Sequence, residues 1–177
     1  MLLDDGLRGR RVVRPLVAEG EAAAVSEELV KELERQEQEL VFTHFDNEDA
    51  WWLGSRLVEM AAGRPVAIDI RRGTQQLFHA ALPGAVADND RWIERKVRVV
   101  ERFGASSYLV GRRLALMGRE LGAGMGLDPA DYAAHGGAFP VRIRNVGVVA
   151  VVTVSGLPQA DDHALVVSAL ERFRSER

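Results

Sequence analysis

The chain of 177 residues contains no cysteine. Disulfide bonds, thiolate nucleophiles and metal sites ligated by cysteine sulfur are therefore excluded. A chain without cysteine is typical of a reducing compartment, so we expect a cytoplasmic location.

Long hydrophobic runs and an excess of positive charge are also missing. The longest apolar run, Val146 to Val154, contains a glycine and has about half the length of a membrane-spanning helix. The first six residues lack the basic start and apolar core of a secretory signal. The formal net charge is −3, whereas nucleic-acid-binding domains usually carry a clear basic excess. We therefore expect neither a membrane nor a nucleic acid as partner.

Patterns that would indicate catalysis or metal binding are scarce as well. No nucleophile and base stand in a recognisable motif, and the histidines lie far apart at positions 44, 79, 135 and 163. Without a His-x-His or His-x-x-x-His pair, no metal site is predicted. The glycine-rich segment 122–126 follows a helical pattern rather than a strand, which is the wrong context for a phosphate-binding loop. Whether the chain is an enzyme stays open, with the balance against it.

What the chain does have is the composition of an ordinary folded domain. Hydrophobic residues make up 47% and charged residues 28%, and the length suits a single core. Residues 1–15 are polar, with no sustained period, and are predicted to form an N-terminal arm. Residues 16–177 are predicted to form one domain.

The first half of the chain predicts two helices, a short strand and a hairpin. Apolar residues at helical spacing predict a helix over 21–39, and a short apolar run predicts a strand over 40–44. Asp46 or Asn47 is expected to cap the next helix. Alternating apolar residues then predict a hairpin over 66–81.

The second half predicts three more helices and a second hairpin. We expect one helix from Asp88 or Asn89 to Gly104, and another that opens at Ser106 or Ser107. The second of these is expected to bury a stripe formed by Val110, Leu114, Met117 and Leu121. A hairpin follows over 138–154, and a last helix is expected to open at Asp161 or Asp162.

The predicted order of elements is therefore α-β-α-β-β-α-α-β-β-α. Because two hairpins dominate, we expect an α/β (α+β) fold with one largely antiparallel sheet, made of the hairpins plus a strand. Helices pack on its faces, and the helices near 21–39 and 160–174 are expected to cover it.

Three segments together resemble a known family: THFDNEDAWWLG at 43–54, HGGAFP at 135–140 and VSGLPQ at 154–159. They are similar to uncharacterised protein family 0303, within the haem-degrading-domain superfamily that includes the GlcG-like and HbpS-like proteins. The resemblance extends from about Glu21 to Arg174. It implies a profilin-like fold, assembly into a homodimer or larger ring, and haem as a possible cofactor, but it assigns no role to a particular residue.

A first candidate site lies where the short strand leads into the next helix. Exposed backbone N–H groups at a helix start can bind an anion, which would place His44, Asp46, Asn47 and Glu48 around a ligand. The alternative is that the two middle residues only cap the helix. Trp51 and its neighbour Trp52 point about 100° apart on a helix, so one can enter the core while Trp51 faces a pocket or a second subunit.

A second candidate site is the glycine loop before the last hairpin. His135 stands beside Gly136 and Gly137, whose lack of Cβ atoms lets ligand atoms approach the backbone. Phe139 follows, and His135 could bind haem iron through a ring nitrogen. The alternative is a tight turn that needs glycine. His163, in the last helix, is a possible further member of the pocket, and Asp161 and Asp162 beside it are explained by capping.

The helix over about 88–104 also carries a row of arginines on one face, at Arg91, Arg95, Arg98 and Arg102. The row could bind an anionic ligand or a haem propionate. Glutamates on the same helix make a solvated, ion-paired face the simpler interpretation.

We therefore expect a non-enzymatic domain that binds a small molecule, with haem or a related tetrapyrrole as one possibility, and that forms a homo-oligomer. A protein-interaction scaffold and a haem-degrading enzyme are the alternatives. The segments His44–Glu48 and His135–Phe139 are predicted to meet in space, or across a subunit interface, and to line one site.

Overall fold

A computed structural model describes residues 25–177 of the chain. The predicted arm over residues 1–15 lies outside the described residues. In these, the order of helices and strands is the predicted one, with a short 3-10 turn added before the last hairpin. The elements are α1 (Glu27–Glu39), β1 (Val41–Phe42), α2 (Asn47–Ala61), β2 (Ala67–Arg72), β3 (Gln75–Ala81), α3 (Ala87–Phe103), α4 (Ser107–Leu116), η1 (Ala123–Met125), β4 (Ala138–Ile143), β5 (Gly147–Ser155) and α5 (Gln159–Glu176).

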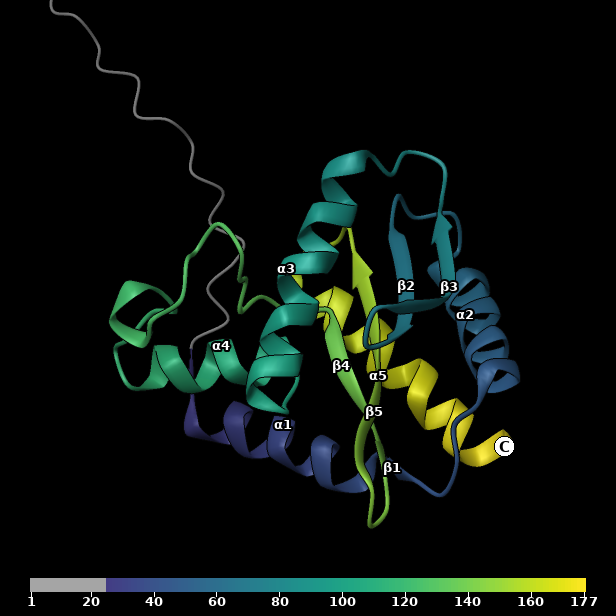
Figure 1. Cartoon of the computed structure of the whole chain (residues 1–177), viewed down its shortest axis with the longest axis horizontal. Coiled ribbons are helices and arrows are strands. Elements are labelled where there is room, and N and C mark those ends of the chain that lie inside the picture. Colours follow the sequence, from purple (N-terminus) through teal and green to yellow (C-terminus); the bar gives the residue numbers. More distant parts are fainter. Residues whose placement is uncertain (1–24) are drawn as a thin grey trace, which may run out of the picture.

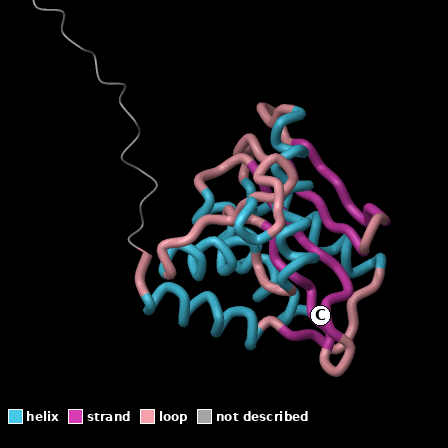
Figure 2. The backbone as a smooth tube through the Cα atoms, turned by 60° about the vertical axis from the view of Figure 1, so that its left-hand side comes forward, coloured by secondary structure: helices cyan, strands magenta, loops and turns pink. Residues whose placement is uncertain are grey.

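The strands form a five-stranded sheet in the order β1-β4-β5-β2-β3 (Figures 1 and 2). Both hairpins lie in this sheet, and β2 pairs antiparallel with β5, so the prediction of one largely antiparallel sheet is confirmed. The short strand β1 is the exception, because it pairs parallel with β4. In the middle of the sheet, Ala67 lies opposite Ser155 and Ala138 lies opposite Thr153.

One face of the sheet is covered by α2 and α5. Alternate residues of the central strands, among them Ile68 and Val152, point to this face and pack against Leu57 of α2 and Leu170 of α5. The three aromatic residues Phe42, Phe45 and Trp52 surround Phe173 at the end of α5. This face holds the largest buried cluster of the described residues.

The opposite face is covered by α3, whose Ile93, Val97 and Val100 pack against Ala67, Ala138 and Val151. Because the central strands are covered on both faces, consecutive residues of both are buried, over 67–70 in β2 and 150–155 in β5. The helix α1 was expected to cover the sheet, and this was wrong. It lies against α4, and Val30 and Leu33 of α1 pack with Leu109 of that helix.

The helix ends agree with some predicted caps and correct others. Asp46 caps α2 and forms a capping box with Asp49, as the sequence predicted. In α3 the N-cap is Val86, and Asn89 accepts a hydrogen bond from the Val86 N–H from inside the first turn. Because α4 already ends at Leu116, Met117 lies outside the helix and is 60% exposed instead of buried.

Candidate functional site

A buried ion pair joins α3 and α5 past one end of the sheet. Nζ of Lys96 in α3 lies 3.0 Å from Oδ2 of Asp162 in α5, and it also donates to the Val154 carbonyl of β5 at 3.1 Å. Lys96 is 3% exposed and Asp162 is 1% exposed. Such a pair holds its elements in one geometry, because separating the charges inside the protein is strongly unfavourable.

Asp162 also orders the turn between β5 and α5. Its carboxylate accepts hydrogen bonds from the N–H of Leu157 at 3.0 Å and of Gly156 at 3.4 Å. The helix itself begins two residues before Asp161, at Gln159, because Pro158 takes the N-cap position. The expectation that Asp161 or Asp162 opens the last helix is therefore wrong, and Asp162 has a tertiary role instead.

Burial is the largest influence on the protonation of both partners. It lowers the pKa of Lys96 and raises the pKa of Asp162, while their mutual attraction and hydrogen bond offset part of each shift. Groups with perturbed pKa values beside a cavity are candidates for a functional site.

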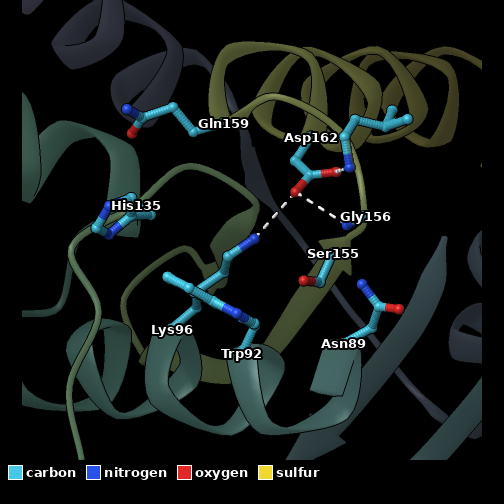
Figure 3. A pocket seen from close by; sticks show the side chains of 9 residues that line it. Asn89, Trp92, Lys96, His135, Ser155, Gly156, Gln159 and Asp162 are labelled. Carbon is cyan, nitrogen blue, oxygen red and sulfur yellow. Dashed lines mark hydrogen bonds and ion pairs between the residues drawn. The ribbon is translucent and has the colours of Figure 1, made fainter. Parts of the chain in front are cut away.

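A cavity of about 230 Å³ opens beside this ion pair. It lies between α3, the turn after β5, the start of α5 and the loop before β4, and Figure 3 shows its side chains arranged around the Lys96–Asp162 interaction. Charged, amide, hydroxyl and aromatic groups all contribute to its wall. The lining residues are Asn89, Trp92, Lys96, His135, Ser155, Gly156, Leu157, Gln159 and Asp162.

The glycine loop packs tightly against residues that lie in or beside the cavity wall. A Cβ atom on Gly137, where φ is +129°, would lie 2.3 Å from the Val154 carbonyl oxygen and 2.8 Å from Nζ of Lys96. A Cβ atom on Gly136 would lie 1.9 Å from the carbonyl oxygen of Gln159. The glycines are therefore needed because the protein's own backbone and Lys96 approach them, which is a different reason from the approach of a ligand.

His135 stands at the mouth of the cavity and packs edge-on against Trp92, with the ring centroids 5.3 Å apart. The same Trp92 ring also contacts Arg95, whose guanidinium carbon lies 4.5 Å from the ring centre. Arg95 donates to the Pro129 carbonyl, and Arg98 interacts with Asp131. Part of the predicted arginine row thus fixes the loop that leads to His135.

Sequence reasoning missed Lys96, although the sequence carries a signal for it. Asn89, Trp92 and Lys96 recur at positions i, i+3 and i+7 of α3, which places them on one helix face. Lys96 also lies three residues after the buried Ile93, so a charged residue interrupts the apolar stripe of the helix. A lysine in such a position requires a buried partner, but the partner in α5 is 66 residues away and no local pattern identifies it.

The other predicted segment, His44 to Glu48, does not lie near this cavity within one chain. It follows β1, whose Phe42 pairs with Ile143 at the end of β4, whereas His135 precedes the start of β4. A strand of six residues spans roughly 20 Å, so the two segments lie at opposite ends of the sheet within one chain. That they meet across an interface between two copies stays a prediction.

The polar side chains of the His44 segment mainly form contacts around the start of α2. Asp49 is buried and interacts with Arg177 at 2.8 Å and with His44 at 3.6 Å. Asn47 accepts a hydrogen bond from Arg72, and Glu48 is exposed in the first turn. His44 lines a separate cavity of about 240 Å³ next to Phe173 and the end of the chain.

The remaining candidate residues divide between the surface and the core. Trp51 is 62% exposed and stands edge-on against Phe78, while its neighbour Trp52 packs into the core. Phe139 is buried. His163 is also buried, with Nε2 2.8 Å from Oε1 of Gln36, and it faces Phe139 rather than the cavity beside Lys96.

Residues 25–177 contain no group of three or more histidine, cysteine, aspartate or glutamate side chains placed to hold a metal ion. Within the same range, no helix combines the length and the apolar character needed to cross a bilayer.

The fold and this site define a class: a mixed α/β domain built on one sheet, with a small polar cavity where two helices and a glycine loop meet. Residues 45–171 match the family model of the haem degrading protein HbpS-like family, and the chain belongs to this family and to its UPF0303 proteins. The resemblance found in the sequence is thereby confirmed.

Two relatives show how close this relationship is. The UPF0303 protein of Streptomyces coelicolor is 63% identical over 149 residues, which cover 83% of this chain and 94% of the relative. The UPF0303 protein of Edwardsiella ictaluri is 51% identical over 150 residues, which cover 84% of this chain and 96% of the relative.

Solved structures show the same fold. The crystal structure of the Ybr137w protein has a TM-score of 0.79 and 32% identity, covering 88% of this chain and 92% of that one. The structure of PduOC in complex with haem has a TM-score of 0.60 and 18% identity, covering 74% of this chain and 94% of that one. This second likeness concerns the fold alone.

Proposed function

We propose that this protein binds a small molecule through a carboxylate or carbonyl group that reaches Lys96. The observation that carries the proposal is the position of Nζ, buried at the wall of a cavity. A lysine ammonium has three N–H donors, and Val154 and Asp162 accept two of them. The third is left for an acceptor in the cavity, where a hydrogen bond to a charged group is stronger than in water.

The rest of the cavity suits a short polar ligand with a small apolar part. Trp92 and Leu157 supply apolar surface, and Asn89, Ser155 and Gln159 supply polar groups. Pockets that bind small molecules usually combine apolar walls with a few convergent polar groups. The buried ion pair fixes Lys96 in advance, which lowers the entropy lost on binding.

The description of the family names haem, and this ligand fits the cavity only in part. Lys96 could pair with a propionate, and His135 offers an imidazole at the mouth. However, the cavity of about 230 Å³ is smaller than the roughly 300–1,000 Å³ typical of pockets for larger ligands. A tetrapyrrole ring therefore does not fit inside this cavity of a single chain, whereas one carboxylate arm does.

Self-association is the second part of the proposal, because the chain exposes large apolar side chains near one edge of the sheet. Trp51 is 62% exposed and packs on Phe78 of the edge strand β3, and Val86 is 63% exposed just after that strand. Exposed tryptophan is enriched at protein interfaces. A homo-oligomer would also let a larger ligand lie between copies.

The binding proposal can be tested by titrating ¹⁵N-labelled protein with propionate and following the amides of Gly136, Gly137 and Gly156. We expect these amides to shift in the wild type and in Arg91→Met, an exposed position of α3, but not in Lys96→Met. Shifts of the same size and the same affinity in Lys96→Met would contradict the proposal. Because Lys96→Met leaves Asp162 buried without its partner, the double variant Lys96→Met/Asp162→Asn repeats the test with a neutral pair.

A separate titration with hemin addresses the haem hypothesis. A Soret band that saturates at one hemin per chain or per pair of chains, and shifts in His135→Ala, would support haem binding at this mouth. An unchanged spectrum of hemin in the presence of the protein would exclude it. Propionate binding is expected in either case.

A further inference from the structure

A second cavity lies on the other side of His135 and is unrelated to the ion pair of Lys96. Its volume is about 390 Å³, within the usual range for small-molecule pockets. It is formed by α3, α4 and the loops on either side of η1, and His135 is the residue that it shares with the first cavity. The lining residues are Arg95, Gly111, Arg112, Leu114, Ala115, Arg119, Glu120, Leu121, Pro129, Tyr132, Ala133, Ala134 and His135.

The charge of this second cavity is predominantly positive. Arg95, Arg112 and Arg119 all line it, and Glu120 is the acidic residue in its wall. Within residues 25–177, the guanidinium groups of Arg112 and Arg119 make no hydrogen bond or ion pair, although the backbone N–H of Arg119 donates to the Leu114 carbonyl. Arg112 instead stacks over Tyr108, with its guanidinium carbon 5.3 Å from the ring centre.

Buried polar atoms in the wall also lack partners. Nε of Arg95 and Nε of Arg112 are both inaccessible to solvent and make no hydrogen bond within the described part of the chain. Buried donors are nearly always paired in folded proteins, so these two guanidinium groups keep unused hydrogen-bonding capacity beside the cavity. Guanidinium groups bind carboxylate and phosphate oxygens in forked geometry, which makes an oxyanion the natural acceptor.

The remaining wall is apolar and partly flat. Leu114, Leu121, Pro129 and Tyr132 contribute hydrocarbon and aromatic surface. Gly111 allows the loop to lie directly on α4, because a Cβ atom there would be 2.0 Å from the Ala134 carbonyl oxygen. The cavity thus combines cationic donors with a surface against which a flat apolar group can pack.

We propose that this second cavity binds a small organic oxyanion, a carboxylate or phosphate group carried on a flat apolar body, with Arg112 and Arg119 as its main charged contacts. The proposal does not depend on the ligand of the Lys96 cavity. It also gives the stacked arrangement of Arg95 on Trp92 a role, because this stack forms the partition between the two cavities.

The test measures binding of 2-naphthoate to the full chain by calorimetry, with the neutral 2-naphthamide and inorganic phosphate as comparisons. We expect 2-naphthoate to bind at least tenfold more tightly than either. Arg112→Met should weaken binding about tenfold or more, the effect of losing one charge-assisted hydrogen bond. Arg102→Met, an exposed arginine of α3 outside the cavity, should leave the affinity unchanged.

Arg119→Met provides a second variant, because Arg119 is exposed and its replacement is expected to leave the fold intact even if Arg112→Met lowers stability. It is expected to weaken 2-naphthoate binding severalfold. The proposal is overturned if 2-naphthoate does not bind, if both arginine variants bind it as the wild type does, or if the amide or inorganic phosphate binds equally well. Binding that is lost in Lys96→Met but kept in both arginine variants would place the ligand in the first cavity and overturn it too.

Discussion

His163 is a histidine held almost entirely away from solvent. It is 4% exposed, its Nε2 lies 2.8 Å from Gln36, and Nδ1 has no hydrogen-bond partner within the described chain. Tyr108 and Phe139 pack against its ring. Burial lowers the pKa of His163 from 6.5 to about 4, because a charged imidazolium would be poorly solvated there.

This shift predicts that His163 destabilises the folded protein in mild acid, whereas the raised pKa values of the Glu37 and Asp162 carboxyls act in the opposite direction. The unfolded chain binds a proton at His163 near pH 6.5 and the folded chain only near pH 4, so the unfolded state is favoured as the pH falls through this window. His163 makes its full contribution to the free energy of unfolding above about pH 6.5. By pH 4 this contribution has fallen by about 3 kcal/mol. The free energy of unfolding, measured by urea titration between pH 7.5 and 4, checks this.

The matched variants are His163→Gln and His79→Gln. His163→Gln is expected to make the free energy of unfolding depend less on pH. His79, which is exposed and interacts with Asp90, is the control, and His79→Gln is expected to keep most of the wild-type pH dependence. An equal pH slope in the wild type and in His163→Gln would show that other groups cause the acid sensitivity.

The elements α3 and α5 lie on opposite faces of the sheet, and the Lys96–Asp162 pair connects them past the end of β5. The same carboxylate holds the turn after β5, and the same ammonium holds the Val154 carbonyl. One interaction thus sets the relative position of a strand end and two helices. This is why the first cavity has a defined wall.

A double-mutant cycle is expected to show strong coupling between these helices. Lys96→Met or Asp162→Asn alone should lower the free energy of unfolding by about 3–5 kcal/mol, because each leaves a buried group without its partner. The double variant should recover much of this loss, since two neutral groups of similar volume remain. Chemical denaturation of the four proteins gives the coupling energy, and simple additivity of the single effects would contradict the assigned role. Glu32→Gln, in an exposed pair on α1, is the control and should change stability by less than about 1 kcal/mol.

The whole molecule presents β3 at one edge of its sheet, with Trp51 and Val86 exposed nearby. An unpaired strand edge beside exposed apolar side chains favours association with another chain. The same molecule places the cavities beside His135 and the segment at His44 at opposite ends of β4. Only an assembly of copies can bring these two regions together.

We predict that the protein is at least a homodimer at micromolar concentration and that Trp51→Glu weakens the assembly. A charge at this position would have to be desolvated in an interface, which is unfavourable without a partner. Light scattering measures the mass, for which the monomer value is 19.5 kDa. Met117→Glu, at an exposed position after α4, serves as the control. A wild-type mass of 19.5 kDa at all micromolar concentrations would contradict the predicted homodimer.

Most of the element order could be read from the sequence because helix and strand periods are local. Alternation in Val66–Ile70 and the capping residue Asp46 each depend on neighbours within a few positions. The ends of helices were less predictable. Met117 continues the apolar stripe of α4, yet the helix has already ended, and Gly118 beyond it has φ of +63°.

The sequence by itself determined the family, the mixed α/β class and the two hairpins. These features are encoded in motifs and short periods, which neighbouring residues define without reference to the rest of the chain. Only the tertiary structure decided that α1 lies on α4, that Gly137 makes room for Lys96, and that Lys96 meets Asp162. Each of these contacts joins residues far apart in the chain, and burial in the folded protein is what makes the partner necessary.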